Sequence, residues 1–274
     1  MLPLQNIDPL YILEPAVVIA LSVALILYWK FSGRSFTRWA LIFSLAAYAG
    51  AIIIKVVFQL LTINTVTSTF GSASVVTGLY YGLQTVILEV GGAYVLAVYA
   101  VSRKRFSEID AGAYGISLAF WENGIYLGLF SLISLVSIYS VLATGTGSSA
   151  TLVYNALQKG EPALFNPPSV ALSPIAFGIL ERISSIILHS AWGYLTVLAA
   201  VYKKKSYLAI ALPMGLADFF VPFASELGLA TFESIIFLIA AVSILVAFQI
   251  GRHLPRPAPA PETSQPDSGV KSSP

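Results

Sequence analysis

The stretch VVTGLYYGLQTVILEVGGAYVLAVYAVSRKR, residues 75–105, decides the fold class of this chain. Its first 27 residues, 75–101, contain a single charged side chain, Glu89, and a basic triplet follows directly at 103–105. A transmembrane helix needs about 20 predominantly apolar residues to cross the hydrocarbon core of a bilayer. The stretch therefore predicts a membrane-spanning helix with a basic end.

The composition of the whole chain agrees with this interpretation. Of its 274 residues, 57% are hydrophobic and 10% are charged, whereas a soluble domain carries about 25% charged residues. A soluble globular protein and disorder over most of the chain are both excluded. The formal net charge of +2 gives no reason to expect a nucleic-acid partner, so membrane lipid is the expected surrounding. The absence of Cys excludes disulfides, thiolate metal sites and cysteine nucleophiles.

Six further apolar stretches have the length of a membrane span. Together with 75–101 they predict an all-α, polytopic membrane helix bundle with seven transmembrane helices at 10–31, 39–63, 75–101, 111–143, 171–202, 206–226 and 231–251. The segments 64–74 and 144–170 between spans read as loops, the first Thr/Ser-rich and uncharged, the second exposed. We expect a membrane domain over 1–253 and a disordered, Pro/Ser-rich cytoplasmic tail over 254–274.

The basic residues predict the orientation. Twelve of the 15 Lys and Arg residues fall in alternate connections or after the last span, so they lie on one side. The opposite connections carry only Lys159, and the other two basic residues, Lys55 and Arg182, fall inside spans. The positive-inside rule then predicts an outside N-terminus and a cytoplasmic C-terminus. A multi-pass protein of a plasma membrane is the expected localisation.

Ionisable residues inside spans are the candidates for function, since each costs at least about 2.5–3.5 kcal/mol to insert. They are Lys55, Glu89, Glu122, Glu181, Arg182, His189 and Asp218. Counted from the basic clusters at about 1.5 Å per residue, Glu89 and His189 lie roughly 21 Å deep. The same count puts Glu122 and Asp218 roughly 18 Å deep. Four consecutive spans therefore place three carboxylates and one imidazole in one layer. Glu14 and Glu233 fall near outer helix ends, where we expect water to reach them.

Carboxylate and imidazole groups at one depth are suitable ligands for Zn²⁺, and a further carboxylate can take a proton from an activated water. The alternative is that the same groups pair with one another and hold helices together. We expect Lys55 either to extend toward the membrane surface or to neutralise a nearby carboxylate, rather than to act in catalysis. Glu181 and Arg182 should support the bundle near the outer rim, and as sequence neighbours they should not face each other.

At these residues the chain resembles the YhfC-type intramembrane metalloproteases, which are related to the PrsW proteases and the CAAX-type prenyl endopeptidases. The resemblance covers roughly 75–225. It rests on ILEVGGAY around Glu89, on GISLAFWENG with Glu122, on LERISSIILHSAWGYL with Glu181, Arg182 and His189, and on MGLAD with Asp218. The family pattern has a second Glu and an Arg where this chain has Val90 and Ala93. It has His where this chain has Leu118 and Met214.

The resemblance implies an intramembrane metal-dependent peptidase of a prokaryotic plasma membrane. Its substrate would be a membrane-embedded or membrane-proximal peptide bond, and its metal Zn²⁺ or another divalent ion. His189, Asp218 and Glu122 would bind the metal, and Glu89 or Glu122 would act as general base. Two alternatives stay open: a catalytically inactive membrane scaffold of the same fold, which the missing His positions favour, and a proton- or cation-coupled transporter that uses the carboxylates as a relay.

Overall fold

The computed structural model describes residues 5–144 and 147–254. With η marking 3-10 and π segments, the elements are η1 (Pro9–Ile12), α1 (Leu13–Phe31), α2 (Arg38–Phe70), α3 (Val75–Gln84), η2 (Thr85–Val90), α4 (Gly91–Ser102), η3 (Glu108–Asp110), α5 (Ala111–Ala119), η4 (Phe120–Leu129), α6 (Phe130–Thr144), α7 (Ser148–Gly160), η5 (Pro162–Phe165), α8 (Pro168–Tyr202), α9 (Lys205–Ala211), η6 (Leu212–Phe223), α10 (Ala224–Leu227) and α11 (Leu229–Arg252). The described part of the chain contains no strand, which confirms the all-α class.

The prediction of seven spans is also confirmed. The helices long and apolar enough to cross a membrane are Pro9–Phe31, Arg38–Phe70, Val75–Ser102, Glu108–Ala143, Pro168–Tyr202, Lys205–Leu227 and Leu229–Arg252. Apart from the end of the second, every boundary lies within three residues of the predicted one. The predicted orientation of the termini stays a prediction. The predicted tail from Pro255 onward lies outside the described residues.

The prediction of a loop at 64–74 was wrong for most of that segment, because α2 continues to Phe70. Threonine hydroxyls near its end donate to the carbonyl four residues earlier, Thr62 to Phe58 at 2.7 Å and Thr67 to Ile63 at 2.9 Å. These bonds satisfy the hydroxyls without breaking the helix. The helix ends at Gly71, whose φ of +90° is accessible to glycine and costly for other residues.

The segment 144–170 was predicted to be an exposed loop, and this was wrong in part. It contains the helix α7 and the short segment η5. Phe165 is buried with Ile7 and Leu142 in a small apolar cluster, against which Val153 and Leu157 of α7 pack. Val153 and Leu157 are four residues apart and so share one helix face. This spacing gives α7 an apolar side that its polar composition obscures.

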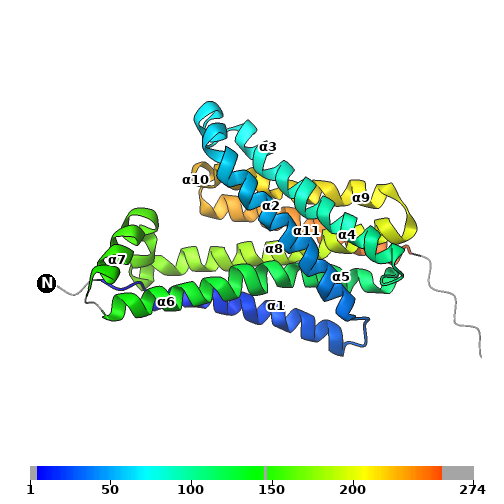
Figure 1. The fold of residues 1–274 in the computed structure, drawn as a ribbon, viewed down its shortest axis with the longest axis horizontal. Helices are drawn as coiled ribbons and strands as arrows, with labels where there is room; N and C mark the ends of the chain where they lie inside the picture. The colour runs from blue at the N-terminus through cyan, green and yellow to red at the C-terminus, as the bar shows by residue number, and fades with distance from the viewer. Residues whose placement is uncertain (1–4, 145–146, 255–274) are drawn as a thin grey trace, which may run out of the picture.

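The helix α8 is the central element of the bundle (Figure 1). It packs against α1, α4, α5, α9 and α11, and its C-terminal half is buried on nearly all sides. Small residues let the neighbours approach closely: a Cβ atom at Gly115 of α5 would lie 2.3 Å from the backbone oxygen of Ser190. Close approach of this kind is how membrane helices gain contact without a hydrophobic driving force.

Three of the spans depart from α-helical geometry near their middle. The π segments η2 and η4 interrupt the third and fourth spans, and the 3-10 segment η6 makes up most of the sixth. Glu89 lies in η2, Glu122 in η4 and Asp218 in η6. Because π segments occur frequently at functional sites, these irregular turns direct attention to the polar layer.

Candidate metal centre

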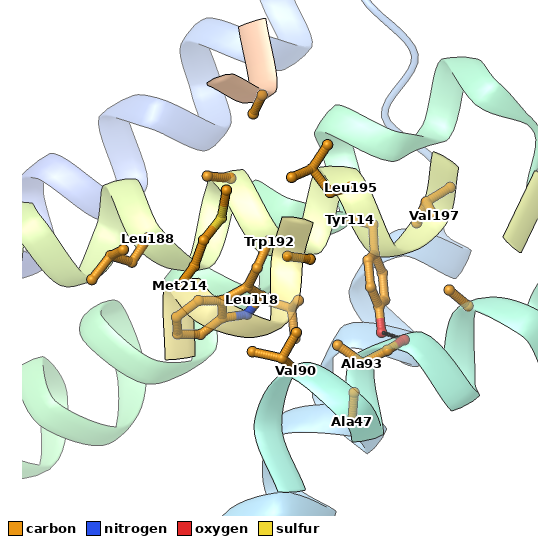
Figure 2. Packing of buried hydrophobic residues seen from close by; sticks show 14 of the residues in the cluster. Ala47, Val90, Ala93, Tyr114, Leu118, Leu188, Trp192, Leu195, Val197 and Met214 are labelled. Atoms are coloured by element: carbon orange, nitrogen blue, oxygen red, sulfur yellow. Dashed lines mark hydrogen bonds between the residues drawn. The ribbon is translucent and has the colours of Figure 1, made fainter. Parts of the chain in front are cut away.

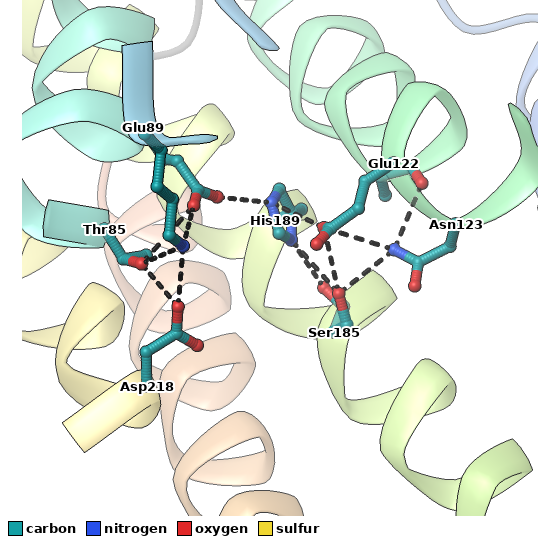
Figure 3. Close-up of polar contacts among 9 residues, drawn as sticks. Thr85, Glu89, Glu122, Asn123, Ser185, His189 and Asp218 are labelled. Atoms are coloured by element: carbon teal, nitrogen blue, oxygen red, sulfur yellow. Dashed lines mark hydrogen bonds and ion pairs between the residues drawn. The ribbon is translucent and has the colours of Figure 1, made fainter. Parts of the chain in front are cut away.

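The polar residues predicted to share one depth do meet inside the bundle (Figure 3). The carboxylates of Glu89 and Glu122 approach the His189 ring from two other helices. Asp218 reaches the same cluster through the ammonium group of Lys55. Equal depth did not determine how each helix is rotated about its axis. In this structure all four spans direct these polar side chains toward one interior.

His189 is held so that one ring nitrogen faces the carboxylates. Its Nδ1 lies 3.0 Å from the backbone oxygen of Ser185, one turn earlier in α8. A carbonyl oxygen only accepts, so Nδ1 must carry the proton of a neutral ring. The lone pair is then on Nε2, which is the arrangement found when a histidine binds a metal and its other nitrogen donates to the protein.

Two carboxylate oxygens approach that lone pair. Nε2 of His189 lies 2.7 Å from Oε2 of Glu122 and 3.4 Å from Oε2 of Glu89. One ligand atom from each of the three residues can be chosen so that all lie within 4.8 Å of one another. His189 and Glu89 are buried and Glu122 is largely covered. Nε2 is buried, and its two close neighbours are carboxylate oxygens, which accept hydrogen bonds and do not donate to a lone pair. A divalent cation among these atoms would bind the lone pair and both carboxylate oxygens, so the residues present fit a metal.

The two glutamates are positioned by separate sets of hydrogen bonds. Oε2 of Glu122 accepts from the Ser185 hydroxyl at 3.0 Å and, more weakly, from the Asn123 amide at 3.5 Å. Asn123 also donates to Ser185 at 3.1 Å, so this side of the site is a closed network. Glu89 uses its other oxygen, Oε1, for the protein, which leaves Oε2 directed toward His189.

Lys55 joins Glu89 to Asp218. Its Nζ lies 2.6 Å from Oε1 of Glu89 and 2.9 Å from Oδ2 of Asp218. The hydroxyl of Thr85 lies between the same groups, 2.8 Å from Nζ of Lys55 and 2.5 Å from Oδ2 of Asp218. Residue counting places Lys55 closer to the outer side than its partners, and its four-carbon side chain spans that difference. Of the two alternatives for Lys55, the structure shows the pairing with carboxylates.

Asp218 takes a different place from the one predicted for it. It is not among the three residues whose ligand atoms lie within 4.8 Å of one another. Both of its side-chain contacts in the described part of the chain use Oδ2. Its side chain is 36% exposed, against 6% for Glu89, and it lines the cavity beside the cluster. The geometry thus brings together Glu89, Glu122 and His189 as one group, with Asp218 beside it.

A cavity of about 140 Å³ adjoins this cluster. Its lining includes the four polar residues of the predicted layer together with Lys55, and it extends past Glu181 and Arg182. Against expectation, Glu181 and Arg182 do interact, through Oε1 and Nη2. Adjacent helical residues point in different directions, but these two side chains are long enough to bend together.

Glu233 was expected to be reached by water near the outer end of the last span, and this was wrong. Its side chain is 1% exposed, and its Oε2 has no hydrogen-bond partner in the described part of the chain. One face of this helix end, with Phe232 and Glu233, is buried against the bundle, whereas Leu229 and Ser234 are exposed. Position near a helix terminus therefore did not predict exposure.

Sequence reasoning missed Thr85 and Ser185, which hold the charged groups in place. Each lies four residues before a candidate site residue, Thr85 before Glu89 and Ser185 before His189. Residues four apart share a helix face. The presence of a hydroxyl at that spacing was a signal that could have identified both.

At four positions the family motifs have polar residues and this chain has apolar ones. These four positions lie together beside the site. Val90, Ala93, Leu118 and Met214 are all buried in one apolar cluster. Figure 2 shows Leu118 and Met214 around the indole of Trp192, whose ring lies 4.0 Å from that of His189. The four residues are mutually compatible, since apolar side chains at all four positions add no buried polar group that would need a partner.

Comparison with known protein families agrees with a metal-binding group at this site. A family model described as YhfC intramembrane metalloprotease matches residues 17–241, which is most of the chain. No curated protein and no solved structure matches. The match extends over five whole spans and over parts of the first and the seventh, and it includes every residue of the metal-ligand group. The chain belongs to the YhfC intramembrane metalloprotease family.

Proposed function

We propose that the protein is an active intramembrane metallopeptidase that hydrolyses membrane-embedded or membrane-proximal peptide bonds of protein substrates. One observation carries the proposal: a buried group of Glu89, Glu122 and His189 with converging ligand atoms, in a chain of a metalloprotease family. The proposed setting is the plasma membrane of a prokaryote, with membrane lipid around the bundle.

The charges of the cluster support a divalent ion. With His189 neutral, three carboxylates and the Lys55 ammonium leave two negative charges in a largely buried space. Uncompensated charge in a low-dielectric interior is costly. A doubly charged cation would neutralise the cluster, and Zn²⁺ accepts both imidazole and carboxylate ligands.

We assign His189, Glu122 and Glu89 as the three protein ligands, a number that leaves one position open for catalysis. At such a site a divalent ion supplies Lewis-acid chemistry, polarising a peptide carbonyl and making a water more acidic. Asp218, which lines the cavity, would accept a proton from the attacking water and return it to the departing amine. Lys55 holds Asp218 and Glu89 in place by binding one oxygen of each.

This assignment exchanges two of the roles predicted from the sequence, in which Asp218 is a ligand and Glu89 a general base. The reason is geometric. Glu89 has an oxygen 3.4 Å from Nε2 of His189, whereas the contacts of Asp218 go to Lys55 and Thr85. Asp218 is also the more accessible of the two carboxylates.

Metal content of variants tests the ligand set. The protein and its variants are purified in detergent with Zn²⁺ supplied and then washed, and bound metals are measured by inductively coupled plasma mass spectrometry. We expect about one Zn²⁺ per wild-type chain and loss of most of it in Glu89→Gln and Glu122→Gln. Asp218→Asn should keep the metal. Glu226→Gln, which changes an exposed carboxylate away from the site, is the matched control.

Hydrolysis tests the base. With a fluorogenic peptide carrying an apolar segment in proteoliposomes, Asp218→Asn should lose activity by about 100-fold or more while it keeps its metal, as expected for a general base. Loss of metal in Asp218→Asn with retention in Glu89→Gln would restore the roles predicted from the sequence. A wild-type protein that binds no divalent metal would refute the proposal and leave the scaffold or the transporter.

A further inference from the structure

A second, larger cavity lies on another face of the bundle. It has a volume of about 550 Å³ and a mainly apolar lining contributed by α1, α5, α8 and α11. It shares no lining residue with the cavity at the metal centre. Phe248 of its wall is 61% exposed and Ile244 is 38% exposed, so this wall faces the surroundings of the bundle rather than its core. In a membrane protein those surroundings are lipid.

The groove has a polar end and an apolar end. Arg34, which follows α1, and Arg252, the last residue of α11, both line it. These two arginines belong to the side of the chain that carries the basic connections. Toward the bilayer centre the lining becomes Leu25, Ile186 and Ile244. The direction of each helix agrees, since α1 and α11 end at the basic side.

The length of the groove corresponds to one leaflet. From Ile244 to Arg252 is eight residues of α11, about 12 Å at 1.5 Å per residue. Half of a hydrocarbon core of about 30 Å is about 15 Å. A lipid chain lying along the groove would therefore have its headgroup at the level of the two arginines.

Both arginines are available to bind an anion. In the described part of the chain neither forms an ion pair with a carboxylate. Each guanidinium instead lies over an aromatic ring, Arg34 at 4.4 Å from the centre of Trp29 and Arg252 at 5.7 Å from that of Phe248. Stacking on a ring leaves the N–H groups of a guanidinium free to donate to phosphate oxygens.

We propose that this groove is a binding site for an anionic phospholipid of the surrounding bilayer, with one acyl chain along α8 and α11 and its phosphate between Arg34 and Arg252. Basic pockets between transmembrane helices on the cytoplasmic side suit anionic headgroups. The site is independent of the metal centre and of its catalytic activity.

Lipid retention tests the site. Full-length protein is purified in detergent with dioleoyl phosphatidylglycerol and dioleoyl phosphatidylcholine in equal amounts, and bound lipid is measured by native mass spectrometry. We expect the wild type to retain phosphatidylglycerol selectively. The double variant Arg34→Gln/Arg252→Gln should bind it about 30-fold more weakly, since each basic side chain contributes about a factor of five at such a surface.

A matched control removes the same charge elsewhere. Arg103→Gln/Lys204→Gln changes two basic residues of the same side that do not line the groove. It should change phosphatidylglycerol retention less than about 3-fold. Ile244→Trp, which narrows the apolar end, should lower retention of the lipid while both arginines remain.

The outcomes separate this site from its alternatives. Equal losses in the groove variant and the control would show general surface attraction and would overturn the proposal. Competition by glycerol phosphate, which has no acyl chain, would reduce the site to an anion site and would also overturn it. Failure of dihexanoyl phosphatidylglycerol to compete at concentrations at which the dioleoyl lipid binds would support the acyl groove.

Discussion

At the scale of single residues, His189 has the most specific role in the site. It is the one of the chain's two histidines that lies inside a span. His189→Ala should abolish metal binding and leave the protein folded, because interhelical hydrogen bonds in membranes average about 0.6 kcal/mol. Metal content and a thermal unfolding curve in detergent measure the two effects.

The conservative variant separates ligation from helix contact. In His189→Gln the amide can still bond to its neighbours but is a poor replacement for an imidazole ligand. We therefore expect loss of metal here too, whereas His253→Gln, at the exposed end of α11, should retain it. Full metal content in His189→Gln would remove this residue from the ligand set.

Lys55 is the residue whose removal should cost most in stability. It is 14% exposed and compensates both Glu89 and Asp218. Removing one partner from a buried ion pair costs about 3–5 kcal/mol, because the remaining charge stays buried. Lys55→Met should therefore unfold at a clearly lower temperature in detergent.

Second-site variants provide the control for Lys55. Lys55→Met/Glu89→Gln should recover part of the lost stability, since it removes one of the two uncompensated charges. Lys55→Arg keeps the charge and should destabilise much less. A Lys55→Met protein as stable as the wild type would show that the ammonium does not hold the carboxylates together.

At the scale of secondary-structure elements, the site depends on how α5 meets α8. α5 continues into η4, which contains Glu122, and α8 contains His189. A Cβ at Gly115 would lie 2.3 Å from the Ser190 oxygen, and one at Gly193 would lie 2.5 Å from Cα of Gly115. The crossing is therefore closed by backbone atoms, which cannot rotate away as a side chain can.

We expect Gly115→Ala to separate α5 from α8, at a cost of about 1–3 kcal/mol, and to lower metal content as well. Gly50→Ala is the matched control. Gly50 lies within α2, and a Cβ atom there would have no neighbouring atom within 4 Å. That substitution should be neutral or stabilise slightly, by helix propensity. Equal behaviour of the two variants in thermal unfolding and metal assays would contradict the proposed role of the crossing.

The irregular turns matter at the same scale. Residues on a regular helix advance about 100° each, and a wider or tighter turn changes the direction of every side chain around it. Glu89 and Glu122 lie in π segments and Asp218 in a 3-10 segment. Hydropathy does not distinguish these geometries, because the same apolar residues have the same hydropathy in an α, a π or a 3-10 turn.

At the scale of the whole molecule, the basic connections predict how the bundle sits in the membrane. A reporter that is active only in the cytoplasm should work when fused after Lys205 and fail when inserted near Asn155 of α7. The reason is that basic loops are retained on the cytoplasmic side. The reverse pattern would overturn the orientation and would move the proposed lipid site to the other leaflet.

The sequence by itself determined the seven spans. A helix in lipid satisfies its own backbone hydrogen bonds, so each span is encoded by its own length and apolarity. Residue counting also determined that Glu89, Glu122, His189 and Asp218 share a depth. It missed the end of α2 and the helix α7, where hydroxyl-rich or polar composition hid helical structure.

Only the tertiary structure decided what those residues do with one another. It turned four spans so that Glu89 and Glu122 face His189, placed Lys55 between Glu89 and Asp218, and buried Leu118 and Met214 against Trp192. These outcomes depend on the rotation of each helix about its axis. Close backbone contacts and irregular turns set that rotation. The contacts form between spans and the irregular turns are local departures from α-helical geometry, and the apolar pattern of a single span encodes neither.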